Sequence, residues 1–309
     1  MAAYERAMVG ETADRTEINS SKTKPGSFSA LVVAYYRSAA FARLSESTKT
    51  TYRGIIERLR SDYGDKPIAR LERRHVAAMI DGRAQTPAAA NNALRILRML
   101  MGFALERGMI SADPTWQVKK IKNKAKGFRT WTGEDIAAFE ATWPIGSKPR
   151  LALSLLLYTA QRRSDVVLMG PQHVRGGRLQ LRQRKTGTEI DMPIHPELAR
   201  VIAATHCGDL TFLVTKYGKP RTPAGFSGWF VDCARKAGLP PESIPHGLRK
   251  AASRRLAEAL RSAHEIMAVT GHRILKEVTR YTEAASRARL ADSAIGALSG
   301  GRDKDETGT

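Results

Sequence analysis

The sequence predicts a mainly α-helical protein with one small β-sheet, divided into two domains. Three observations support this fold class. Apolar residues recur at helical spacing between about residues 27 and 109, one hairpin pattern spans residues 178–194, and a lysine-rich segment separates the two regions. At 309 residues the chain is long enough for two domains that each bury a core.

The first domain is expected at residues 26–115, as a bundle of helices. Ser27 can cap a first helix that runs to about Ala42, and Ser45 or Ser47 can cap a second. In the second helix, apolar side chains recur at steps of three and four, which predicts one buried face. A short third helix is expected around residues 74–81.

A long fourth helix is predicted to open at Thr86-Pro87 and to end near Arg107, since proline is favoured in the first turn of a helix. One face of this helix carries core-like apolar residues. Another face carries Asn91, Arg95 and Arg98, spaced by four and three residues. This polar and basic stripe suits contact with phosphate, and it equally suits a plain solvated surface.

Three segments are polar and show no periodicity. Residues 1–25 are predicted to be a disordered arm and residues 299–309 a disordered tail. Residues 116–128 are predicted to be a basic linker, which either follows a DNA backbone or acts as a simple hinge. The basic residues that we single out there are Lys119, Lys120, Lys122, Lys124 and Lys126.

The second domain is expected at residues 129–298, with mixed α and β structure. Thr132 and Asp135 resemble a capping box at the start of its first helix, and a buried helix is predicted near residues 151–158. Two strands, at residues 178–184 and 189–194, are joined by the turn Lys185-Thr186-Gly187-Thr188. Further helices are expected at residues 223–237, 245–260, 264–270 and 286–298.

Charge narrows the class of partner. Lys and Arg total 51 against 30 Asp and Glu, which leaves a net charge of +21. Such a field attracts polyanions, and because the basic residues run through the whole chain they favour nucleic acid over a membrane surface. The two cysteines, Cys207 and Cys233, lack the paired spacing of a metal or disulfide framework. No apolar signal-like segment is present, so a cytoplasmic location is expected.

Four segments carry residues suited to chemistry on a phosphodiester: residues 159–165, 185–187, 246–249 and 271–282. A lone His-x-x-Arg or Lys-Thr-Gly means little. Together, in this order and ending in a tyrosine nine residues after His272, they resemble the catalytic set of the tyrosine recombinases, or phage-type integrases. The resemblance covers residues 130–290 by motif. It implies a helical core-binding domain followed by a catalytic domain.

The resemblance implies a role for each residue. Tyr281 is the nucleophile, Arg162 and Arg249 clamp the phosphate, His246 and His272 assist, and Lys185 is the general acid. The chemistry agrees, because guanidinium meets phosphate with two parallel hydrogen bonds and histidine can accept the tyrosine proton. From the residues alone, Arg163 is as plausible a phosphate ligand as Arg162, and Asp165 is expected to have a structural role. The family's small-residue turn is replaced here by Ala259-Leu260-Arg261, which puts the geometry of that turn in doubt.

The expected function is therefore site-specific DNA recombination through a 3′-phosphotyrosine intermediate, for a phage or genomic island. The resemblance implies double-stranded DNA with specific sites, a tetramer on DNA and accessory bending or directionality factors as partners. No cofactor or metal is expected, because the phosphotyrosine bond conserves the energy of the broken one. Two alternatives remain: a type IB topoisomerase-like relaxing enzyme and a catalytically inactive DNA-binding regulator. The segment at residues 286–298 is expected to dock on its own domain or on a neighbouring protomer.

Overall fold

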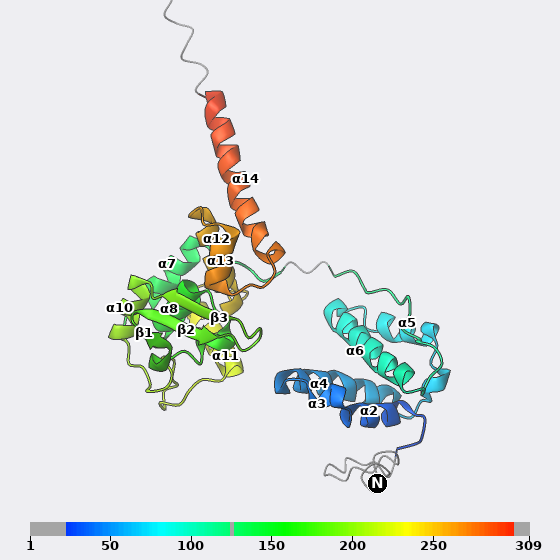
Figure 1. Ribbon diagram of the computed structural model, residues 1–309. Helices are drawn as coiled ribbons and strands as arrows, with labels where there is room; N and C mark the ends of the chain where they lie inside the picture. The colour runs from blue at the N-terminus through cyan, green and yellow to red at the C-terminus, as the bar shows by residue number, and fades with distance from the viewer. Residues whose placement is uncertain (1–22, 124–126, 300–309) are drawn as a thin grey trace, which may run out of the picture. The chain divides into compact units, whose positions relative to one another are not determined.

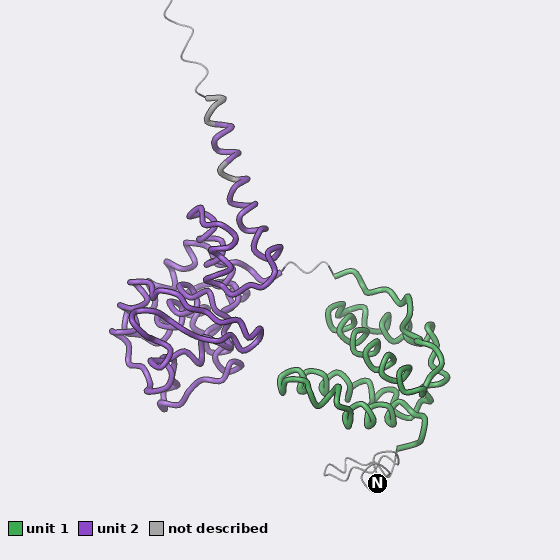
Figure 2. Tube along the Cα trace, viewed as in Figure 1, with its two compact units in different colours: residues 1–125 green, residues 126–309 purple. Residues whose placement is uncertain are grey.

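The chain forms two compact units, residues 1–125 and 126–309 (Figure 2). The computed structural model describes residues 23–123 and 127–299. The division between the units falls inside the segment that we expected to be a linker. Most of the predicted arm and nearly all of the predicted tail lie outside the described residues.

Unit 1 is a helical bundle (Figure 1). Its α-helices are α2 (Phe28–Tyr36), α3 (Ala39–Ala42), α4 (Glu46–Tyr63), α5 (Arg73–Asp81) and α6 (Pro87–Glu106). The predicted apolar faces meet in one core, in which Ile56 and Leu59 of α4 pack with Leu94 and Leu97 of α6. The predicted caps at Ser27 and Ser45 are confirmed, since each hydroxyl accepts a backbone N–H of the first helical turn.

The prediction of a single first helix up to Ala42 is wrong, because the first helix ends at Tyr36 and a second begins at Ala39. The hydroxyl of Ser38 donates to the carbonyl oxygen of Tyr35 over 2.6 Å and accepts from the backbone N–H of Phe41 over 3.2 Å. One serine therefore closes α2 and caps α3. Serine inside an apolar pattern gives no sequence signal that separates these two uses.

Unit 1 extends beyond the predicted boundary at residue 115. Val118 is buried in its core and Ile121 packs against that core. The side chain of Asn91 exchanges two hydrogen bonds of 2.9 Å with the backbone of Ile121, and Arg98 donates to the carbonyl oxygen of Val118 over 2.6 Å. The first part of the expected linker is thus attached to α6.

Unit 2 is mainly helical with a three-stranded antiparallel sheet of order β1-β2-β3, which confirms the predicted fold class (Figure 1). The strands are β1 (Val174–Arg175), β2 (Arg178–Arg182) and β3 (Glu189–Pro193). The helices are α7 (Gly133–Thr142), α8 (Lys148–Thr159), α9 (Arg163–Val166), α10 (Pro196–Ala204), α11 (Pro223–Lys236), α12 (Pro245–Glu258), α13 (Ala263–Thr270) and α14 (Lys276–Ser299). The buried helix α8 packs against α9, α10, α11 and α12 and forms the centre of the core.

Several local predictions hold in unit 2. Thr132 and Asp135 form the expected capping box, in which Thr132 accepts from the Asp135 N–H and Asp135 accepts from the Thr132 N–H. The hairpin pairs Gln180 with Asp191, and its turn lies at the predicted residues. Strand β1 and helix α10 were not predicted, although Pro196 at the first position of α10 is a start signal.

The turn at residues 259–261, whose geometry the sequence left open, forms a regular end to α12. Leu260 lies in the left-handed region with φ of 59°, where glycine is usual. Its N–H donates to the carbonyl oxygen of Ala257, and the N–H of Arg261 donates to that of Leu256. This is the Schellman arrangement of a helix end, so the turn keeps its geometry at the cost of an unfavourable leucine conformation.

Helix α14 begins ten residues before the predicted start at Ser286, so the segment is one continuous helix that contains Tyr281. Its first turns pack on α12 and α13. From residue 286 to residue 295, every side chain that the structure describes is exposed, and the helix projects from the body of unit 2 (Figure 1). In the part of the chain that the structure describes, no helix is long and apolar enough to cross a membrane.

Candidate active site

Arg162 is positioned by the turn that ends α8. Ala160 takes a left-handed conformation with φ of 53°, which turns the chain sharply after Thr159. The Thr159 hydroxyl closes the helix by donating to the carbonyl oxygen of Leu155 over 2.6 Å. Arg162 then follows, half-buried, with its Nη1 donating to Oε1 of Gln183 over 2.8 Å. Arg163 is exposed, so the structure favours Arg162 over Arg163 as the residue that faces the site.

Arg249 lies on α12 and is buried, with 3% of its surface exposed. Its Nη1 donates to the carbonyl oxygen of Ala160 over 2.8 Å, and its Nη2 contacts Nε2 of His272 over 3.1 Å. Burial, followed by the charge of Arg162, lowers the pKa of Arg249 to about 10. It is still a cation at neutral pH, and it forms no ion pair among the residues that the structure describes. A buried cation without a carboxylate partner is a ready site for an anion.

His272 follows the left-handed Gly271 that ends α13. Its Nδ1 lies 2.6 Å from the hydroxyl of Thr270, which donates in turn to the carbonyl oxygen of Ile266. Burial and then the charges of Arg249 and Arg162 lower the pKa of His272 to about 4. The imidazole is therefore neutral at physiological pH.

His246 lies one helical turn before Arg249 on α12, as the His-x-x-Arg spacing predicts. Its pKa is lowered, first by burial and then by the charges of Arg249, Lys250 and Arg162. The ring of Phe128 meets the imidazole edge-on, with the two ring centres 4.9 Å apart. His246 is thus held in the neutral form that a general base requires.

Lys185 lies in the hairpin turn and is exposed. Two contacts of its neighbours hold this turn to the body of unit 2. The backbone N–H of Arg184 donates to Oδ1 of Asp165 over 3.0 Å, and the hydroxyl of Thr186 donates to Oε1 of Gln183 over 2.7 Å. Asp165 has the structural use that its sequence position suggested.

Tyr281 lies on the inner face of α14, where it packs in a small apolar cluster with Ala257, Ile266 and Val278. Its hydroxyl accepts a hydrogen bond of 3.1 Å from Arg280.

The structure thus links the sequence-predicted residues into one site on unit 2. Arg249 contacts His272 directly, and Arg162 is connected to His272 through hydrogen bonds of Gln183 and Thr270. His246 adjoins them along α12. Lys185 and Tyr281 are placed by the neighbouring hairpin and helix.

Three buried polar residues of this site were not singled out from the sequence: Gln161, Gln183 and Thr270. One signal was available. Along β2 and its continuation, Leu179 and Leu181 point inward, and Gln183 occupies the next position on that face. A glutamine at an inward position needs hydrogen-bond partners there.

The residues proposed for DNA contact in unit 1 have varied surroundings. Asn91 and Arg98 hold the segment at residues 118–121, as described above. Arg95 donates to the hydroxyl of Tyr52 over 3.0 Å and lies over its ring. Lys119, Lys120 and Lys122 are exposed. Lys124 and Lys126 lie outside the described residues.

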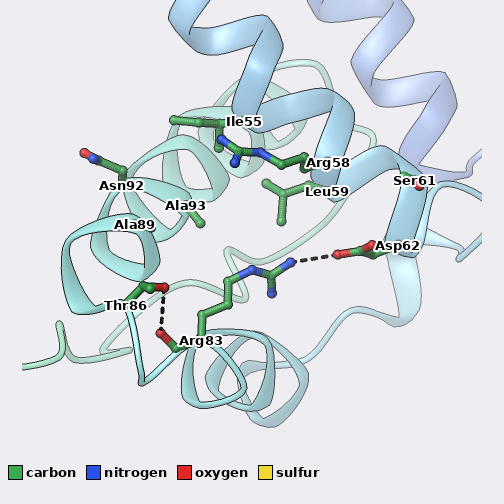
Figure 3. Close-up of a pocket in the computed structure, with 10 residues that line it drawn as sticks. All are labelled: Ile55, Arg58, Leu59, Ser61, Asp62, Arg83, Thr86, Ala89, Asn92 and Ala93. Carbon is green, nitrogen blue, oxygen red and sulfur yellow. Dashed lines mark hydrogen bonds and ion pairs between the residues drawn. The ribbon is translucent and has the colours of Figure 1, made fainter.

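Unit 1 also has a surface pocket of about 410 Å³ between α4, α6 and the loop that precedes α6 (Figure 3). Arg83 reaches across it and forms an ion pair of 2.8 Å with Asp62. None of the catalytic candidates lines it. Across the described residues, no three His, Cys, Asp or Glu side chains gather as a metal site would require.

Comparison with known proteins identifies relatives of this chain. A family model described as the phage integrase family matches residues 133–287. The integrase of Escherichia phage HK022 is 25% identical over 221 residues, which is 67% of this chain and 62% of that protein. The integrase of Escherichia phage lambda is 23% identical over 234 residues, which is 71% of this chain and 66% of that protein. The chain thus spans slightly less than two thirds of these relatives.

Solved structures share the fold. A lambda integrase (residues 75–356) dimer bound to a COC′ core site superposes with a TM-score of 0.73 and 21% identity, covering 82% of this chain and 94% of that one. The Tn1549 transposon integrase (residues 82–397) in complex with a circular intermediate DNA gives a TM-score of 0.69 and 18% identity, covering 86% and 99%. Residues 133–287, which the family model matches, include all six catalytic candidates: Arg162, Lys185, His246, Arg249, His272 and Tyr281.

Proposed function

This chain belongs to the phage integrase family, and we propose that it is a site-specific recombinase that cleaves and rejoins double-stranded DNA through a 3′-phosphotyrosine link at Tyr281. It would act on the sites of a phage or genomic island, within the nucleoid. The observation that carries the proposal is the pair of guanidinium groups, Arg162 and the buried Arg249, which lack a carboxylate partner among the described residues and lie beside two neutral imidazoles.

A phosphodiester supplies the anion that this pair lacks. Arg162 and Arg249 would each donate to the non-bridging oxygens, and their positions are set before DNA arrives. Donors that are fixed in advance stabilise the charge that grows in the transition state. His272, whose Nε2 contacts Arg249, would bind the same phosphate.

Tyr281 would attack the phosphorus, forming the phenolic oxygen–phosphorus bond while the bond to the 5′-oxygen breaks. The tyrosine proton passes to neutral His246, and Lys185 donates a proton to the departing 5′-oxygen. The 5′-hydroxyl of a partner strand then attacks the phosphotyrosine and restores Tyr281. No external energy source is consumed, because one phosphoester replaces another at each step.

Positive charge outside the catalytic site supports a second DNA-binding surface. Lys119, Lys120 and Lys122 are exposed on a segment that Asn91 and Arg98 attach to α6. We assign phosphate contact to these lysines and to Arg95, together with Lys124 and Lys126 from the sequence pattern. Asn91 and Arg98 would serve mainly by holding the basic segment in place.

Assembly on DNA is part of the proposal. A lambda integrase tetramer bound to a Holliday junction has the same fold, with a TM-score of 0.73. We propose that this chain also forms a tetramer on two sites, and that bending or directionality factors assist it. The exposed second half of α14, with Leu290 and Ile295 each 63% exposed, supports docking on a neighbouring protomer rather than on its own domain.

One experiment separates this function from its two alternatives. Duplexes are first selected by binding from a random pool, and the selected duplex is incubated with protein in EDTA without nucleotide. A recombinase gives a covalent protein–DNA band on a denaturing gel and joins two plasmids that carry the site. A topoisomerase-like enzyme relaxes supercoiled plasmid that lacks the site. An inactive regulator binds the duplex and gives no covalent band.

A further inference from the structure

We propose that Gln183 is a positioning residue that holds Arg162, the Lys185 hairpin and the His272 turn in one fixed arrangement. The inference rests on the proposed function and extends it to a residue that does not touch the reacting atoms. It is carried by the hydrogen bonds of one buried amide, whose four partners belong to three segments of the site: residues 161–162, Thr186 and Thr270.

The Gln183 side chain is buried, with 1% of its surface exposed, and every hydrogen-bonding position of its amide is used. Oε1 accepts from Nη1 of Arg162 over 2.8 Å and from the hydroxyl of Thr186 over 2.7 Å. Nε2 donates to Oε1 of Gln161 over 2.6 Å and to the carbonyl oxygen of Thr270 over 2.9 Å. Since arginine can only donate, the orientation of the amide is determined by its partners.

These partners reach three catalytic elements. Arg162 is itself a clamp residue. Thr186 adjoins Lys185, so its bond ties the hairpin to the amide. Thr270 precedes the turn that presents His272, and its hydroxyl contacts the imidazole. Removing the amide would therefore release three catalytic elements at once.

The backbone around Gln183 strengthens the same connections. Its N–H donates to the carbonyl oxygen of Thr188, and its carbonyl oxygen accepts from the N–H of Gly187, each over 2.8 Å. These bonds close the turn that carries Lys185. On the other side, Gly271 lies so close that a Cβ atom there would collide with the Gln183 amide. The absence of a side chain at residue 271 lets the two segments meet.

A buried amide in a core is often only a satisfied polar group. Two features distinguish this one. Its bonds to Arg162 and Thr270 join segments that are 21 and 87 residues away in the sequence, and the first of them holds a cation that has no carboxylate partner among the described residues. Lys185 is exposed, so contacts of its neighbours must define where the hairpin lies.

Two variants separate the connections. Gln183→Met keeps the side-chain length and loses all four bonds of the amide. Thr186→Val removes only one of these four, the bond between the hairpin and the amide, together with the hydrogen bond that the Thr188 hydroxyl donates to Thr186 within the turn. Gln180→Met is the matched control, since Gln180 lies on β2, which leads into Gln183, and its amide donates to the surface residue Asp191. Cleavage is measured as single-turnover formation of the Tyr281 adduct on the selected duplex. Two substrates are used, one with the natural 5′-oxygen and one with sulfur in its place, which departs without a proton.

On the oxygen substrate, Gln183→Met should lower the cleavage rate about 100-fold, because misplacement of a catalytic group costs that much. Thr186→Val should lower it about tenfold, which corresponds to the one lost hydrogen bond to the amide. Binding should stay within about twofold of wild type, near the scatter expected of a substitution that removes no contact with DNA. On the sulfur substrate, the cleavage rate of Thr186→Val should return almost to the wild-type value, since only Lys185 is displaced. The rate of Gln183→Met should recover only in part, since Arg162 is displaced as well.

A purely structural role would lower cleavage equally on both substrates, and that result, or wild-type cleavage by both variants, overturns the proposal. Hydrogen exchange in the DNA-free protein tests the connection without cleavage. Gln183→Met should speed exchange at residues 184–188 and 270–272, and Gln180→Met should not. Unchanged exchange contradicts the inference even if wild-type protein forms no adduct. Loss of the adduct by the wild type itself would instead refute the proposed function.

Discussion

Arg249 and His272 meet through Nη2 and Nε2 across 3.1 Å. Arginine can only donate, so Nε2 of His272 is the acceptor and the proton is on Nδ1, which points at the Thr270 hydroxyl. A buried cation thus fixes the tautomer of its neighbour.

Burial of His272, followed by the charge of Arg249, makes the stability of the protein depend on pH. The pKa of His272 falls from 6.5 to about 4 in the folded protein, so the unfolded chain binds more protons between these values. The contribution of His272 to stability is therefore fully present above pH 6.5 and is lost as the pH falls toward about 4. His272→Gln removes the titrating group and should flatten this part of the curve. Chemical denaturation of both proteins across that range measures it, and parallel curves would contradict the assignment.

Lys185 should act on the leaving oxygen. Lys185→Ala should cleave the natural duplex about a hundredfold more slowly, within the range for loss of a general acid. The duplex with sulfur at the bridging position should be cleaved at close to the wild-type rate. The same two substrates tested with His246→Ala give the comparison, since loss of the base should slow both. Equal defects of Lys185→Ala on both substrates would move the acid role elsewhere.

Replacing the left-handed Leu260 with glycine should stabilise the folded protein. Glycine avoids the steric cost of that conformation, which is about 1 kcal/mol. Leu260 is exposed, so its replacement removes little packing. Leu260→Gly should raise the melting temperature of the protein and leave DNA cleavage unchanged. Lower stability would mean that the leucine side chain has a contact worth more than the strain.

The end of α14 should be needed for assembly and not for folding. Truncation after Arg287 removes residues beyond those that pack in the small cluster around Tyr281. The truncated protein should melt at the wild-type temperature, bind a single site and form an adduct, yet fail to recombine two sites. Leu290→Glu in the full chain should behave in the same way. A large drop in melting temperature would show that the helix docks on its own domain, and full recombination would show that the segment is dispensable.

Sequence patterns predicted the parts of this protein that depend on near neighbours. The caps at Ser27 and Thr132, the hairpin turn and the His-x-x-Arg spacing all act within four residues. The break at Ser38 was missed although it is local, because the same serine fits a continuous helix. Leu260 takes a left-handed conformation that glycine usually occupies, since the surrounding hydrogen bonds outweigh its preference.

Longer-range features could not be predicted in the same way. Gln161, Gln183 and Thr270 meet only after the hairpin, α8 and α13 have packed together. The stripe on α6 was expected to face phosphate or solvent, and instead Asn91 and Arg98 bind backbone atoms near residue 120. The residue pattern of the helix cannot indicate these partners, because they are backbone atoms of Val118 and Ile121 in another segment.

Mapping the covalent adduct tests the catalytic assignment most directly. Protein trapped on the selected duplex is digested with protease and nuclease, and the nucleotide-bearing peptide is identified by mass spectrometry. The phosphodiester remnant should be found on Tyr281, and Tyr281→Phe should bind the duplex with unchanged affinity and give no adduct. A remnant on Tyr158 or Tyr217, or an adduct that persists in Tyr281→Phe, would contradict the account.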